Sequence, residues 1–291
     1  MRNKDAFSGY HPTINFLYFA LVLLFSMCLM HPVYLAISLT GALTYDIYLK
    51  GRKAARFAVM GLLPMAVFAA LVNPAFNHEG ATILTYLPSG NPLTLESMLY
   101  GLSAGGMLAA VLLWFTTYQA VMTSDKFVYL FGRAIPALSL VLSMTLRFVP
   151  KFRAQLRAVQ QARQFAGNSE KTGPIQKVRT SVENFSILVT WSLENAVETA
   201  DSMRARGYGL PSRTAFSIFR FETRDARLLA WLLACGGLVI FGWAAGTLAW
   251  RYYPTVRGGF TGLTALCAAA ELALALTPWA IDAWEARKWN S

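Results

Sequence analysis

The sequence predicts an all-α membrane protein with about six transmembrane helices and a water-facing module of two long, crossing amphipathic helices. Of its 291 residues, 55% are hydrophobic and only 14% are charged, and the mean hydropathy is +0.41. These values favour a bilayer over water as the main solvent. The basic residues are densest between 147 and 227, which hold 14 Lys or Arg and 7 Asp or Glu. This stretch is therefore expected to face water.

Each expected span is an apolar run about as long as a bilayer is thick. The six runs are residues 13–30, 32–49, 57–73, 97–122, 228–249 and 259–281. His31-Pro32 separates the first two, and proline disfavours helix in the residue before it, so a tight helical hairpin is expected there. The connection 50–56 holds four Lys or Arg, which places it in the cytoplasm. Six crossings then put both chain ends in the cytoplasm.

These spans divide the chain into three expected parts. They are an N-terminal transmembrane bundle of four spans (1–133), a cytoplasmic helical module (134–227) and a C-terminal transmembrane hairpin (228–291). In the fourth span, small residues that include Gly101 and Gly105 predict a face where another helix backbone approaches closely.

The loop between the third and fourth spans contains no Lys or Arg, which marks it as the outer face. Within it, residues 82–87 and 92–96 favour β-structure, and the turn-forming segment 88–91 lies between them. A short hairpin is expected, although an irregular loop fits this pattern nearly as well.

Two amphipathic stretches predict the two long helices of the water-facing module. Residues 134–149 run into the first stretch without a turn signal, so a helix is expected to leave the membrane interface here. The helix-breaking segment 167–174 separates the two stretches. Apolar side chains recur at spacings of three and four in both. They are Phe152, Leu156 and Val159 in the first, and Phe185, Val189, Leu193, Ala196, Ala200 and Met203 in the second. Both helices are expected to pack through this stripe.

The same local pattern ends both helices, as Ala162-Arg163-Gln164 and Ala205-Arg206-Gly207. Gly207 suits a left-handed helix cap, and Pro211 keeps the helix from resuming. An arginine in the last turn complements the helix dipole, which is a sufficient structural reason for a single Arg-Gly pair. Two such ends in one basic module also suit docking, because a guanidinium enters a groove and pairs with carboxylate or carbonyl groups.

Residues 198–209, Glu-Thr-Ala-Asp-Ser-Met-Arg-Ala-Arg-Gly-Tyr-Gly, closely resemble the second Ala-Arg-Gly motif of a known family. That family is the transmembrane coupling (T) component of energy-coupling factor (ECF) transporters, related to the Q component of cobalt transporters. Segments 147–150 and 160–164 resemble the start of its coupling helices and its first motif. Segment 94–101 is similar to its fourth-helix entry. The first motif departs from the pattern, because Gln164 stands where the family has glycine.

The resemblance implies a subunit that neither hydrolyses ATP nor binds the nutrient. Residues 162–164 and 205–207 would dock into two cytoplasmic ABC ATPase subunits, with Arg163 and Arg206 seated in their grooves. The membrane part would hold a small substrate-binding S component in a prokaryotic cytoplasmic membrane. The transported substrate, a vitamin, metal ion or other micronutrient, would be set by that S component.

Other function classes find little support in the residues. The sequence has no H-E-x-x-H pattern that would bind a catalytic metal and no G-x-S-x-G pattern that would carry a nucleophile. It also lacks a complete phosphate loop that would bind ATP. We therefore expect no cofactor and no catalytic residue, and an integral-membrane enzyme or a nucleic-acid binder is disfavoured. The main alternative is a self-sufficient secondary transporter, for which Glu271 is the chief ionisable candidate inside a span, although it is also explained as a structural or interfacial residue.

Overall fold

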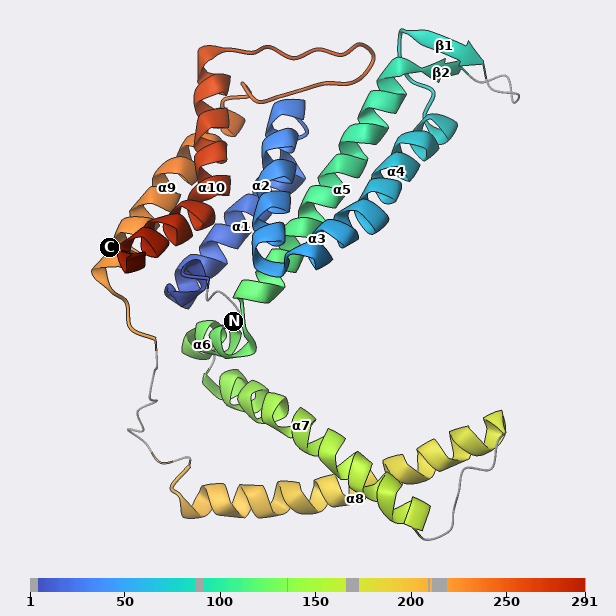
Figure 1. Ribbon diagram of the computed structural model, residues 1–291, viewed down its shortest axis with the longest axis vertical. Coiled ribbons are helices and arrows are strands. Elements are labelled where there is room, and N and C mark those ends of the chain that lie inside the picture. Colours follow the sequence, from blue (N-terminus) through green and yellow to red (C-terminus); the bar gives the residue numbers. More distant parts are fainter. Residues whose placement is uncertain are drawn as a thin grey trace. The chain divides into compact units, whose positions relative to one another are not determined.

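The fold is described from a computed structural model of the chain. The described residues are 5–86, 92–134, 136–165, 173–208, 210 and 219–290. They group into two compact units, which are considered separately (Figure 1). The membrane unit is formed by Met1–Lys126 with Phe219–Ser291, and the crossed-helix unit by Phe127–Ile218.

Helices dominate both units. The membrane unit contains η1 (Phe7–Gly9), α1 (Pro12–Cys28), α2 (Pro32–Lys50), α3 (Arg52–Phe57), η2 (Ala58–Leu62, a π-helical turn), α4 (Leu63–Phe76), β1 (Ile83–Tyr86), β2 (Pro92–Thr94), α5 (Leu95–Val121), α9 (Thr223–Ala244) and α10 (Gly262–Asn290). The crossed-helix unit contains α7 (Pro136–Phe165), α8 (Pro174–Ala205) and most of α6 (Ser124–Ala134). The prediction of an all-α protein is confirmed.

Each of the six predicted spans coincides with a helix of the membrane unit. Among the described residues, four helices are long and apolar enough to cross a membrane, namely Arg52–Phe76, Leu95–Val121, Thr223–Ala244 and Gly262–Glu285. Helix α1 is apolar but shorter. The chain is therefore a multi-pass membrane protein.

Two helix starts differ from the sequence prediction. The segment 50–56 was expected as a connection, but Gly51 (φ +59°) is the only residue between α2 and α3, so the helix resumes at Arg52. Glycine adopts this left-handed backbone without steric cost. Helix α9 begins at Thr223, before the predicted 228, because Glu222 and Asp225 form a capping box that bonds the first-turn amides.

Prolines and glycines set the packing of the bundle. His31 caps α2 by accepting from the Val33 N–H at 3.3 Å, which confirms the hairpin at His31-Pro32. A Cβ added to Gly101 would lie 2.9 Å from the Ala69 carbonyl oxygen, and one at Gly105 would lie 2.8 Å from that of Ala66. The predicted small-residue face is thus confirmed, because α4 packs directly on it.

The loop after α4 contains the predicted hairpin. Strands β1 and β2 pair antiparallel, with Ile83 opposite Thr94 and Tyr86 opposite Pro92. Its turn, 88–91, lies outside the described residues. Glu96 fixes the base of the hairpin, because its carboxylate accepts from the N–H and the hydroxyl of Thr82 at 3.2 and 2.8 Å.

Candidate functional site

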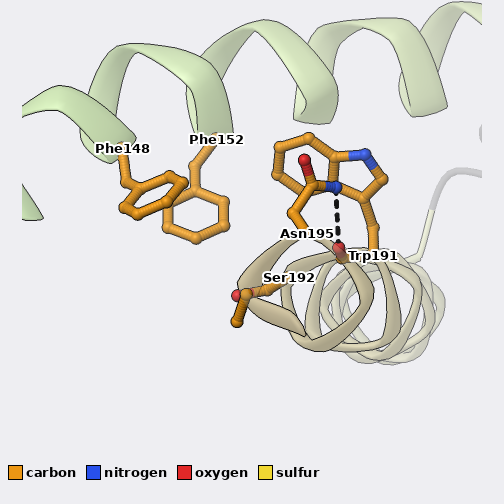
Figure 2. Close-up of a pocket in the computed structure, with 6 residues that line it drawn as sticks. Phe148, Phe152, Trp191, Ser192 and Asn195 are labelled. Carbon is orange, nitrogen blue, oxygen red and sulfur yellow. Dashed lines mark hydrogen bonds between the residues drawn. The ribbon is translucent and has the colours of Figure 1, made fainter. Parts of the chain in front are cut away.

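The candidate site is the pair of long helices α7 and α8, which cross as Figure 1 shows. Their central contact is aromatic: the rings of Phe152 and Trp191 lie 5.7 Å apart, edge to face. Figure 2 shows Phe148 and Phe152 projecting from α7 toward Trp191 and Asn195 of α8. These residues, with Ser192 and Ala196, enclose a small cavity of about 50 Å³. An edge-to-face pair stabilises such a crossing beyond the apolar area it buries.

Helix α8 is reinforced locally at this contact. The Asn195 side-chain amide donates to the Trp191 carbonyl oxygen at 3.0 Å (Figure 2). This bond satisfies the amide one turn further along α8. The crossing therefore combines an apolar contact with polar groups that are paired within their own helix.

Arg163 forms a second contact between the two helices. Its Nη1 donates to Asn184 Oδ1 at 2.7 Å and to the Thr180 carbonyl oxygen at 3.4 Å, and its Nη2 forms an ion pair with Glu183. The Arg163 side chain is 23% exposed, and Asn184 is buried. The first predicted docking arginine is thus engaged within its own subunit.

Glu183 is shared between two cations. Arg179 Nε donates to its other carboxylate oxygen at 3.1 Å from one turn earlier in α8. Hydrogen bonds from the Arg163 and Arg179 guanidinium groups lower the pKa of the Glu183 carboxyl from its usual value. The carboxylate therefore stays ionised, and the contact between α7 and α8 stays intact, at neutral pH.

Arg206 stands at the other end of the site. Its side chain is exposed, and in the part of the chain that the structure describes it has no hydrogen bond or ion pair. Helix α8 ends here in a Schellman motif: the Tyr208 N–H donates to the Met203 carbonyl oxygen at 3.1 Å, and the Gly207 N–H to that of Arg204 at 2.9 Å. Gly207 has φ +75°, so the predicted left-handed cap is confirmed. Pro211 lies outside the described residues.

The neighbours of the two arginines are solvent-accessible. Ala162, Gln164 and Ala205 are exposed, and Gly207 is half-buried. Helix α7 ends at Phe165, one residue after Gln164. Of the predicted break at 167–174, residues 167–172 lie outside the described residues, and α8 begins at its last residue, Pro174.

The predicted packing stripe is only partly used within this unit. In α7, Phe152, Leu156 and Val159 are half-buried. In α8, Met203 is half-buried, whereas Phe185, Val189, Leu193, Ala196 and Ala200 are exposed, although Ala196 also lines the small cavity. With 100° of rotation per residue, these exposed positions lie roughly 100° to 180° around α8 from Asn184 and Trp191. Helix α8 thus meets α7 through another face, because that face holds the largest ring and the acceptors that Arg163 needs.

Sequence reasoning missed the α8 residues that make the contact: Thr180, Glu183, Asn184, Trp191 and Asn195. They are mostly polar, so a search for apolar periodicity passes over them. A search that admitted Trp191 and the amides would find Thr180, Asn184, Trp191 and Asn195 recurring at multiples of a helical turn.

The comparisons with known proteins agree with this architecture. The family model described as "Cobalt transport protein", CbiQ, matches residues 11–216. The chain belongs to the CbiQ family. Several relatives of this chain carry the name energy-coupling factor transporter transmembrane protein EcfT. The one from Exiguobacterium sibiricum is 31% identical over 36% of the chain, and the one from Lacticaseibacillus paracasei is 36% identical over 37%.

The extent of these matches differs among relatives. The chain covers 40% of the length of each of those two proteins. A third EcfT, from Listeria innocua, is 25% identical over 64% of the chain and 75% of its own length. The CbiQ match includes both α7 and α8 and ends after the Arg206 cap, so the crossed helices belong to the part that defines the family.

Proposed function

We propose that the chain is the transmembrane coupling subunit, or T component, of an ECF-type ABC importer. In this proposal it transmits ATP-driven motion of two cytoplasmic ATPase subunits to a substrate-binding S component for uptake of a micronutrient, a vitamin or a metal ion. The CbiQ family match and the EcfT relatives support the class. The observation that carries the mechanism is the exposed Arg206 at the Schellman-capped end of α8.

The cap makes Arg206 suitable for docking because it fixes the last turn of the helix. Two backbone hydrogen bonds and the left-handed Gly207 hold the chain direction, so the guanidinium projects from a defined position. Its five donors are free to pair with carboxylate or carbonyl groups in a groove of an ATPase subunit. A push on this tip then moves the rigid helix behind it.

In this mechanism Arg163 does not dock as Arg206 does but connects the two helices. Its bonds to Glu183 and Asn184 join α7 to α8, so a displacement of one helix is carried to the other. Direct docking of Arg163 in a second ATPase would require these bonds to exchange for bonds to the partner. We propose that Arg206 docks directly and that Arg163 holds the two helices in register.

The exposed face of α8 supports contact with a further apolar partner. Ile175, Val178, Val182, Phe185, Val189 and Leu193 recur at helical spacing, and their exposed fractions range from 40% to 85%. A continuous apolar stripe of this length on a water-facing helix marks an interaction surface. We propose that the S component covers it. ATP hydrolysis is assigned to the partner subunits, with both chain ends of this subunit on the cytoplasmic side of a prokaryotic cell membrane.

A charge reversal at Arg206 tests the docking proposal. Arg206→Glu is expected to abolish co-purification of the ATPase subunits in mild detergent and to abolish uptake. Arg204→Glu is the matched control, because Arg204 lies in the same last turn, is exposed and forms a 3.9 Å ion pair with Asp201. If ATPases co-purify with Arg206→Glu as they do with the control, Arg206 is not the docking residue.

Glu271 supports one alternative function, a self-sufficient secondary transporter. It is 4% exposed within the span Gly262–Glu285, and among the described residues its Oε2 has no hydrogen-bond partner. Intramembrane carboxyls often carry ions or protons. Substrate uptake by the purified chain alone in vesicles, lost in Glu271→Gln, would establish this alternative. The coupling proposal predicts no uptake without partner subunits.

A further inference from the structure

Three cationic side chains lie at the N-terminal end of the helical segment that runs from Arg52 to Phe76. Arg52, Lys53 and Arg56 are exposed, and in the part of the chain that the structure describes none of their side chains has a hydrogen bond or an ion pair. By contrast, the neighbouring Lys50 pairs with Asp46 at 2.8 Å. The first turn of α3 contains no acidic residue. Cations at a helix N-terminus are unfavourable because that end carries a positive partial charge. An external anion would offset this cost.

The three cations line an open groove together with apolar residues. The groove has a volume of about 640 Å³ and is completed by Phe57, Met60 and Gly61. Phe57 is 44% exposed and Met60 is 73% exposed. The helix is π-helical across Ala58–Leu62, where the cationic turn gives way to the apolar one, and such turns occur frequently at functional sites. The groove thus joins a basic end to an apolar end.

The apolar end of the groove continues along the helix into the membrane. Leu63, Phe68 and Leu71 follow the groove along the helix and are 60%, 67% and 63% exposed. In the most apolar 18-residue stretch of Arg52–Phe76, only 6% of the residues are buried. The segment Arg52–Phe76 therefore changes from cationic to apolar within about two turns, as is typical of the end of a membrane-spanning helix.

We propose that this groove is a binding site for an anionic phospholipid. Its phosphodiester group pairs with Arg52, Lys53 and Arg56, and its acyl chains lie along Phe57, Met60 and the apolar face of α4. Guanidinium groups match phosphate oxygens bidentately, and basic pockets at the membrane interface bind anionic headgroups. A free phosphate would use only the cationic end and leave the apolar end uncovered. Charge and hydrophobicity together therefore favour a lipid.

Lipid titration of the purified, full-length chain in a nonionic detergent tests the site. Dioctanoyl phosphatidylglycerol is compared with dioctanoyl phosphatidylcholine and with inorganic phosphate. Each cation near an anionic headgroup contributes about fivefold in affinity. The double variant Arg52→Gln/Arg56→Gln is therefore expected to bind phosphatidylglycerol about 30-fold more weakly. Arg251→Gln/Arg257→Gln is the control, since it removes two exposed guanidinium groups from the loop between α9 and α10 of the same unit.

The wild type and the control are expected to prefer phosphatidylglycerol over both phosphatidylcholine and phosphate. Unchanged phosphatidylglycerol affinity in Arg52→Gln/Arg56→Gln would overturn the site, and phosphate affinity equal to that of the lipid would assign it to a free anion. Photocrosslinking in native membranes, with benzoylphenylalanine in place of Met60, separates lipid from protein. A lipid adduct supports the proposal, and an adduct with another protein shows that a subunit covers this face.

Discussion

Arg163 of α7 donates to Asn184 of α8, with 2.7 Å between Nη1 and Oδ1, while its other terminal nitrogen pairs with Glu183. Arg163, which the sequence suggests as the first of two docking arginines, thus forms an internal contact between two helices. Arg206, at the end of α8, has no such tie among the described residues. Two arginines in similar local sequences therefore have different structural roles.

Loss of the Arg163 hydrogen bonds and ion pair is expected to weaken the contact between α7 and α8 without unfolding either helix. Arg163→Ala removes hydrogen bonds to a charged donor that is partly exposed, so we expect a local cost of about 1 kcal/mol. Faster amide hydrogen exchange in α8 around Glu183 would show this. Arg157→Ala is the control, since Arg157 is exposed on the same helix. Equal exchange in both variants would contradict the tie.

Acid is expected to open the same contact. Because the arginines lower the pKa of Glu183 in the folded state, its contribution to stability is present above the ordinary carboxyl pKa and is lost as the pH falls through the lowered value. Spin labels on α7 and α8 should therefore report a longer or broader distance at acidic pH. In Glu183→Gln the neutral amide does not titrate, so this distance should lose most of its pH dependence. A wild-type distance that does not change with acid would exclude the mechanism.

The aromatic contact is expected to act as a coupled pair. A double-mutant cycle with Phe152→Leu and Trp191→Leu, followed by thermal unfolding, should give a coupling free energy of about 0.5–1.5 kcal/mol. Phe152→Leu with Phe185→Leu provides the control cycle, because Phe185 is 67% exposed on another face of α8 and should show no coupling. Equal coupling in the two cycles would mean that α8 packs through the face predicted from the sequence.

The sequence is sufficient to predict the membrane helices because their signals are local. Long apolar runs, His31-Pro32 and the small residues Gly101 and Gly105 each specify a feature of the bundle without reference to distant residues. The Arg206 cap is local as well, because Gly207 alone permits it. The face through which α8 meets α7 is not local, because it depends on whether Arg163 finds acceptors on the partner helix. Apolar periodicity identifies the stripe at Phe185 and Leu193, but not what covers it.

The close approach of α4 to α5 predicts the last test. Gly105→Ala would place a Cβ 2.8 Å from the Ala66 carbonyl oxygen and 2.9 Å from its Cα. Backbone atoms cannot move aside as a flexible side chain does, so α4 must shift, at a cost of about 1–3 kcal/mol. Gly237→Ala is the control, because a Cβ there meets nothing within 4 Å. Thermal unfolding of the purified chain in detergent should therefore show a lower Tm for Gly105→Ala only. A Tm equal to that of the control would mean that α4 and α5 lie further apart than their packing at Gly105 requires.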